Sequence, residues 1–229
     1  MNAVKRVGSR PTKEKKDKKP KKTKEKQIVI VNNIQSPPNP DSDLRTISLY
    51  GDVTEQKASD IVSGLLYLEN NSHTILPEDP SDTKSREVIV ARSISMVVST
   101  HGGSAAEMFS ILDVMDMIKQ RTCDVETIGI GKVMSAGVPI LAAGTPGKRK
   151  VGSNCRIMLH NVMAGSHGTI ISMENELEEI KWVQERYIHC LAGYTKLTPA
   201  KIKKLLKTQK DVYISAQEAI KMGIADEII

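Results

Sequence analysis

The apolar positions between residues 44 and 229 recur with two different periods, which together predict alternating strands and helices. Alternating or continuous apolar runs predict strands at 45–50, 94–98, 125–130, 148–151, 156–159, 212–214 and 224–229. Apolar residues spaced three and four apart predict helices at 54–71, 104–119 and 170–192, one from Thr198, and a short one opening at Ser215. This alternation indicates an α/β fold of parallel strands joined by right-handed crossovers.

Three segments lack this pattern. Residues 1–27 hold 12 Lys/Arg against 3 acidic residues, a net charge of +9 within a total of +6, so residues 28–229 carry −3. We expect 1–27 to be a disordered Lys-rich tail, able to contact an acidic partner electrostatically but lacking the aromatic residues of a specific nucleic-acid reader. Residues 28–43 predict an extended Pro-rich linker that opens with the β-prone run Ile28–Val31. The polar stretch 70–87 predicts a surface loop.

Composition adds a few limits. A chain of 229 residues with 39% apolar and 26% charged residues suits one sizeable soluble domain with a tail. No apolar run approaches the roughly 18–20 residues that span a bilayer, and the charged N-terminus does not resemble a secretory signal. The odd number of widely spaced cysteines (Cys123, Cys155 and Cys190) predicts reduced thiols in a cytosol-like compartment.

The stretch 128–140 is the first candidate for chemistry. We expect its apolar strand to end at Gly131 and a helix of small residues to begin at Ser135 and run to about Gly144. Backbone N–H groups and the positive end of that helix would then lie near the Ser135 hydroxyl, as an acyl-transfer nucleophile requires. A serine at this position can also be only a helix cap.

Three further features make the nucleophile hypothesis specific. Gly102–Gly103 follows the preceding strand and can offer backbone N–H groups to an oxyanion. His160 ends an apolar strand and is a candidate base, and Asp211 precedes another strand and is a candidate orienting carboxylate. Taken singly, each is as typical of a core or turn residue. The order Ser135, His160, Asp211 differs from those of chymotrypsin, subtilisin and the α/β-hydrolases.

Residues 44–229 resemble the ClpP family, the serine peptidases of the Clp proteases. Gly131–Gly137 (GKVMSAG) is similar to the family's nucleophile turn, G-x-A-A-S-M-G, and Arg156–His160 (RIMLH) to its R-x-M-I-H segment. The stretch 210–226 is similar to its ending R-D-x-F-x-S-A-x-E-A…G-L-x-D. The resemblance implies a ClpP/crotonase-like spiral of βαβ units with a protruding long handle helix.

The resemblance also implies roles for individual residues. Ser135 would attack the scissile carbonyl, His160 would accept and return the proton, and Asp211 would fix the imidazole. The N–H groups of Gly103 and Ala136 would form the oxyanion hole. Gly102 and an adjoining strand formed by Gly165, Ser166, His167 and Gly168 would bind the substrate backbone by strand addition.

The expected assembly follows from the same resemblance. It implies that copies of this chain, alone or with a ClpP paralogue, form two stacked seven-membered rings. A Clp/Hsp100-type ATP-driven unfoldase would feed these rings with unfolded polypeptide. The sequence has no G-x-x-x-x-G-K-[ST] motif, so we expect no cofactor on this chain and ATP chemistry on the partner. We expect no metal site and no membrane association. The expected location is the cytoplasm, a plastid stroma or the cytoplasm of a virus-infected host.

The sequence departs from the family pattern at several places. His101 stands where the family's S-P-G-G has proline, and we expect the loss of a fixed φ to loosen the oxyanion turn. Asn161–Val162 replaces its Q-P, and the loop at 70–87 is longer than usual. Two alternatives therefore stay open. One is a weak or inactive ring subunit that assembles with an active paralogue, and the other is a crotonase-type acyl-CoA enzyme.

Overall fold

The computed structural model describes residues 44–82, 84–207 and 211–229, and the predictions for the tail, for Ile28–Val31 and for the linker lie outside these residues. The elements are β1 (Thr46–Tyr50), α1 (Glu55–Asn70), β2 (His73–Pro77), β3 (Glu87–Ala91), β4 (Ile94–Thr100), α2 (Ala105–Arg121), β5 (Val125–Met134), α3 (Gly137–Ala142), β6 (Arg149–Val151), β7 (Arg156–Leu159), α4 (Ile170–Tyr194), α5 (Pro199–Leu206), β8 (Val212–Ile214), α6 (Ala216–Met222) and β9 (Glu227–Ile228).

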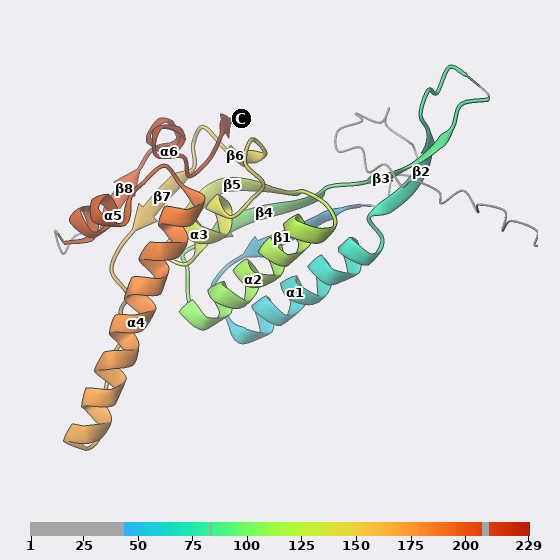
Figure 1. Cartoon of the computed structure of the whole chain (residues 1–229). Helices are drawn as coiled ribbons and strands as arrows, with labels where there is room; N and C mark the ends of the chain where they lie inside the picture. Colours follow the sequence, from blue (N-terminus) through green and yellow to red (C-terminus); the bar gives the residue numbers. More distant parts are fainter. Residues whose placement is uncertain (1–43, 83, 208–210) are drawn as a thin grey trace, which may run out of the picture.

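A mainly parallel sheet forms the centre of the body. Its path is β1-β4-β5-β6-β9, with β7 beside β5 and β8 beside β7. Among the described strands of this sheet, only β8 runs antiparallel to its neighbour. Helices α1 and α2 lie side by side against one face (Figure 1). Fully buried side chains of β4 and α2 meet there, including Met96, Met108 and Met115. The predicted α/β fold with parallel strands is confirmed.

Strand β5 is longer than the sequence suggested. We expected it to stop at Gly131, but it continues to Met134. Its first half pairs with β6 and its second half with β7, and the pairing with β4 shifts register between Val98 and Thr100. Gly131, with φ +64°, lies at this change of partner. The glycine therefore makes a bulge that redirects the strand and does not end it.

The predicted surface loop at 70–87 is wrong for residues 73–77, whereas the described residues between 78 and 86 lie outside strands and helices. Its first part forms β2, which pairs antiparallel with β3, and the resulting hairpin projects from the body (Figure 1). An antiparallel partner supplied by the next apolar segment makes the short run at 73–77 a strand, and Pro77 is tolerated because it stands at the strand's end. Arg45 holds the base of this hairpin by donating to the carbonyl oxygens of Leu68, Asn71, Arg92 and Ser93.

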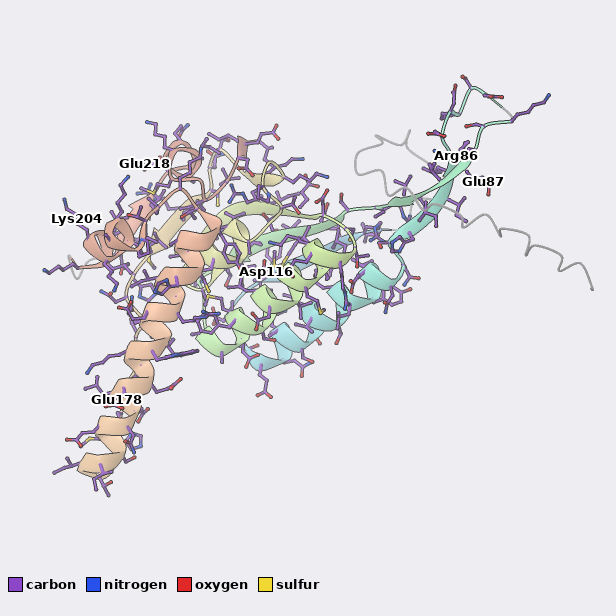
Figure 2. The ribbon with its side chains drawn as sticks, in the orientation of Figure 1. Arg86, Glu87, Asp116, Glu178, Lys204 and Glu218 are labelled. Carbon is purple, nitrogen blue, oxygen red and sulfur yellow. The ribbon has the colours of Figure 1, made fainter. Side chains whose placement is uncertain are left out.

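Helix α4 projects from the opposite side of the body (Figure 1). Its 25 residues make it ~37 Å long. Only its C-terminal half packs on the core, where its buried residues are Tyr187, Ile188 and Leu191. Its first half, which includes the outward-pointing Glu178, is exposed (Figure 2). The predicted long helix is confirmed, and no helix in the described ranges is long and apolar enough to cross a membrane.

The end of the chain is fixed by an ion pair. The predicted strand at 224–229 is shortened to β9, because Asp226 turns toward β6 and accepts two hydrogen bonds from the buried Arg149 guanidinium, at 2.6 and 2.8 Å. Arg149 also donates to the carbonyl oxygens of Ala142 and Tyr194. These bonds join β6 to the ends of α3 and α4, and the Arg149 hydrogen bonds hold the pKa of Asp226 below its usual range.

We expect Asp226→Asn to lower the free energy of unfolding by about 3 kcal/mol at pH 7, because it leaves the buried Arg149 without its counter-ion. A carboxyl whose folded pKa is lowered stabilises the fold above its unfolded pKa, and this contribution is lost as the pH falls through the folded value. The difference in the free energy of unfolding between variant and wild type, measured with urea, should therefore become smaller at low pH.

The matched control is Glu78→Gln, which removes the carboxylate of the exposed hairpin pair Glu78–Arg86 (Arg86 is labelled in Figure 2). An exposed pair of this kind contributes less than about 1 kcal/mol. Equal losses of stability in the two variants would contradict the assignment of Asp226 as the residue that fixes the chain end.

Candidate active site

Ser135 lies at a sharp turn between β5 and α3. Its φ of +53° is the only positive value at a non-glycine position among the described residues. Its N–H donates to the carbonyl oxygen of Met158 at 2.8 Å, and its own carbonyl oxygen accepts from the N–H of Val138 and the hydroxyl of Tyr187. A strained conformation persists only where such contacts enforce it. Helix α3 begins at Gly137, with Ala136 as its N-cap and no side-chain capping bond, so the helix-cap interpretation of Ser135 is wrong.

The glycine turn after β4 packs directly against Ser135. A Cβ added at Gly102 (φ +106°) would lie 2.5 Å from the Cβ and 3.0 Å from the Oγ of Ser135. The turn is fixed by the buried Thr100 hydroxyl, which accepts from the Gly102 N–H, and by a backbone bridge between Gly103 and Val53. These contacts hold the turn without the proline that His101 replaces.

Two backbone N–H groups near Ser135, one on each turn, remain available to bind a ligand. Within the described ranges, the N–H groups of Gly103 and Ala136 donate to no other backbone group. Gly103 and Ala136 both line the pocket that contains Ser135. Both residues expected to supply the oxyanion donors thus line the same pocket as Ser135.

His160 and Asp211 come from neighbouring antiparallel strands. Strand β7 pairs with β8 in the register Leu159↔Val212, so His160 and Asp211 are the next residues in line on the two strands. His160 is half-buried and Asp211 is exposed. No hydrogen bond or ion pair between described residues joins His160 to Ser135 or to Asp211. The sheet thus aligns the two segments while their side chains stay separate in this state of the chain.

One pocket of about 310 Å³ collects four of the ten expected residues, Ser135, His160, Gly103 and Ala136. It is lined by His101, Gly103, Ser104, Ala105, Met108, Ser135, Ala136, His160, Asn161, Val162, Met163 and Tyr187. Gly102 touches Ser135 from beneath the turn, whereas Asp211 lies outside the pocket wall. His101 is exposed and faces the same space as His160.

The expected substrate-binding strand at Gly165–Gly168 is not formed. These four residues are exposed, belong to no strand and lie outside the pocket lining. Both edges of β7, the strand that leads toward them, are already occupied by β5 and β8. The segment therefore has no neighbouring strand in the described part of the chain with which to pair.

Two side chains of α4 contribute to the site although the sequence did not single them out. The buried Tyr187 reaches the carbonyl oxygen of Ser135, and Gln184 accepts the Val162 N–H at 2.7 Å. In the sequence both belong to an ordinary helical pattern. None of the three cysteines lines the pocket, and burial raises the pKa of the Cys155 thiol to about 11, which disfavours a thiolate nucleophile.

The Clp protease family model matches residues 87–229, a range that includes every candidate site residue. This chain belongs to the Clp protease family. The match begins at the second strand of the projecting hairpin and runs to the last residue. Membership of the Clp protease family identifies the chain as a ClpP-type peptidase and removes support for the acyl-CoA alternative.

We expect Gly102→Ala to lower the peptidase activity at least about 100-fold, because the added Cβ must displace Ser135 relative to the N–H groups of Gly103 and Ala136. Gly51→Ala is the control. Gly51 also has a positive φ (+80°), but nothing lies within 4 Å of its added Cβ, so only the backbone is strained. The activities of the two variants are compared on a short fluorogenic peptide, and circular dichroism verifies that both are folded. Equal activities of the two alanine variants would contradict the steric argument.

Proposed function

We propose that this chain is a serine endopeptidase subunit of a self-compartmentalising Clp-type protease that cleaves unfolded polypeptides. Ser135 is the proposed nucleophile, His160 the general base and Asp211 the residue that orients it. The observation that carries the proposal is the strained conformation of Ser135 at the carboxyl end of a parallel strand. It places Ser135 in a pocket shared with His160, Gly103 and Ala136, and the N–H groups of the last two have no backbone partner among the described residues.

The attack step follows from this arrangement. The Ser135 Oγ adds to the scissile carbonyl carbon while His160 takes its proton, and the carbonyl oxygen becomes an oxyanion. The N–H groups of Gly103 and Ala136 would stabilise that charge, with the backbone at the start of α3 adding a favourable field. His160 then gives the proton to the leaving amine, and water hydrolyses the acyl-enzyme by the reverse sequence of proton transfers.

Asp211 would act through the register of β7 and β8. Its carboxylate belongs beside the imidazole N–H, where it selects the tautomer that accepts the Ser135 proton and stabilises the imidazolium. In free enzymes such catalytic hydrogen bonds are often long and tighten only when substrate binds. The lack of hydrogen bonds joining His160 to Ser135 or to Asp211 in the described part of the chain is consistent with that behaviour.

The proposed assembly rests on the exposed half of α4. Large apolar side chains are exposed there and on the segment before it: Met163, Ile170, Ile171 and Leu177. An exposed apolar cluster of this kind marks an interaction surface. We assign it to a second copy of the chain, or to a ClpP paralogue, in stacked rings.

The remaining roles of the proposal concern the ligands. In the rings, the exposed backbone of Gly165–Gly168 would pair with the substrate strand. A Clp/Hsp100-type unfoldase would supply unfolded polypeptide and the ATP chemistry, with no cofactor on this chain. The protein would work in the cytoplasm, in a plastid stroma or in the cytoplasm of a virus-infected host.

We expect Ser135→Ala to abolish cleavage of short fluorogenic peptides and labelling by a fluorophosphonate probe, because both reactions require the serine oxygen as nucleophile. Ser110→Ala is the control, since Ser110 is an exposed serine on α2. Peptidase activity that survives in Ser135→Ala would refute the serine mechanism. Wild-type chain that is neither active nor labelled would favour the inactive ring subunit.

We expect Asp211→Asn to lower kcat about 10³- to 10⁴-fold, because the amide can no longer hold the imidazole in the productive tautomer. Fluorogenic-peptide kinetics at saturating substrate measure this change. EDTA should leave the wild-type rate unchanged, since no step of the proposed mechanism uses a metal ion. A rate within twofold of wild type in Asp211→Asn would remove Asp211 from the mechanism.

A further inference from the structure

We infer that Gln184 and Tyr187 are positioning residues that tie helix α4 to the two segments bearing Ser135 and His160. The inference rests on the proposed function, because it assigns these side chains to the same site. Both residues lie on one turn of α4, at the point where the helix leaves the body. Neither reaches the reacting atoms, so each would act through the residue that it holds.

Tyr187 holds the nucleophile turn. Its hydroxyl donates to the carbonyl oxygen of Ser135 at 3.3 Å, and its side chain is only 4% exposed. Burial raises the pKa of the phenol, which keeps the hydroxyl protonated and a donor. The same carbonyl accepts the Val138 N–H at 3.0 Å, so two donors from α4 and α3 fix the peptide that follows the nucleophile. That peptide carries the Ala136 N–H, the proposed oxyanion donor.

Gln184 holds the segment that follows His160. Its Oε1 accepts the Val162 N–H at 2.7 Å, two residues beyond the proposed base. Because the donor is a backbone N–H, the amide must present its oxygen, and the orientation of the side chain is thereby defined. Val162 also lines the pocket, so this bond sets one wall of it.

The two tethers make the site sensitive to the position of α4. Trp182, on the turn before them, packs edge-on against Phe109 of α2, with ring centroids 6.4 Å apart. A single stretch of α4 (182–187) thus contacts the segments around Ser135 and His160 and the helix after the glycine turn. A shift of α4 along its axis must therefore move both tethered peptides together.

The first experiment compares two tyrosines of α4. Tyr187→Phe removes the hydroxyl bound to Ser135, and Tyr194→Phe removes a hydroxyl bound to Asp116 of α2, away from the pocket (Asp116 is labelled in Figure 2). Tyr187→Phe should lower kcat roughly 3- to 10-fold with KM within about twofold, whereas Tyr194→Phe should leave both unchanged. Equal kcat values in Tyr187→Phe and wild type would overturn the role of Tyr187.

The second experiment asks whether Gln184 acts as an acceptor. Gln184→Met keeps the length of the side chain without an acceptor and should lower kcat roughly 3- to 10-fold, whereas Gln184→Glu retains an oxygen and should restore most of it. Gln217→Met, on the exposed face of α6, is the control and should match wild type. Equal losses in Gln184→Met and Gln184→Glu would show that Gln184 does not position the segment through this bond.

Amide hydrogen exchange separates this inference from the proposed function. Gln184→Met should speed exchange of the Val162 N–H at least about threefold, whether or not the chain is active, because it removes the acceptor of that N–H. Normal exchange at Val162 overturns the Gln184 tether. Absence of fluorophosphonate labelling in wild type, with Val162 exchange changed as expected, would instead overturn the serine mechanism and leave this tether standing.

Discussion

The change of partner within β5 is the constraint on which the rest of the site depends. A strand that stayed beside β6 along its whole length would end within the sheet, and Ser135 would be buried between neighbours. Gly131 adopts a left-handed backbone conformation, which lets the second half of β5 leave β6 and pair with β7. Because His160 directly follows β7, one bulge brings the serine and the histidine to the same edge of the sheet.

The strain at Ser135 is balanced by close packing on three sides. The Met158 carbonyl holds its N–H, the Tyr187 hydroxyl holds its carbonyl, and Gly102 lies where any side chain would collide with it. A left-handed non-glycine residue costs roughly 1–3 kcal/mol, an amount that a buried core of this size supplies. The fold therefore spends part of its stability to present one hydroxyl group.

Local patterns predicted most of the elements, because caps and apolar periods act over a few residues. Thr54, Ser104 and Ser215 begin their helices as expected, and Ser215 with Glu218 forms a capping box. The errors involve partners that lie outside the segment whose pattern was interpreted. The strand at 73–77 depends on β3, and the bulge at Gly131 depends on β7.

The same distinction applies to the site. The residue types and their order along the chain indicated Ser135, His160 and the glycine turn, which the structure gathers at one pocket. The alignment of Asp211 with His160 depends on the antiparallel register of β7 and β8, which periodicity does not contain. The contact from Tyr187 depends on where α4 packs against α3, and no local signal distinguishes this tyrosine from other helix residues.

Arg45 has a consequence for how this chain can vary. Its guanidinium binds carbonyl groups on both sides of the β2–β3 hairpin, and the Arg92 N–H closes the base by donating to Ser72. These hydrogen bonds join the two ends of the hairpin at the surface of the body. A hairpin whose ends are joined in this way can be lengthened, shortened or replaced without disturbing the sheet beneath it. The hairpin is therefore free to evolve independently of the sheet that carries the pocket.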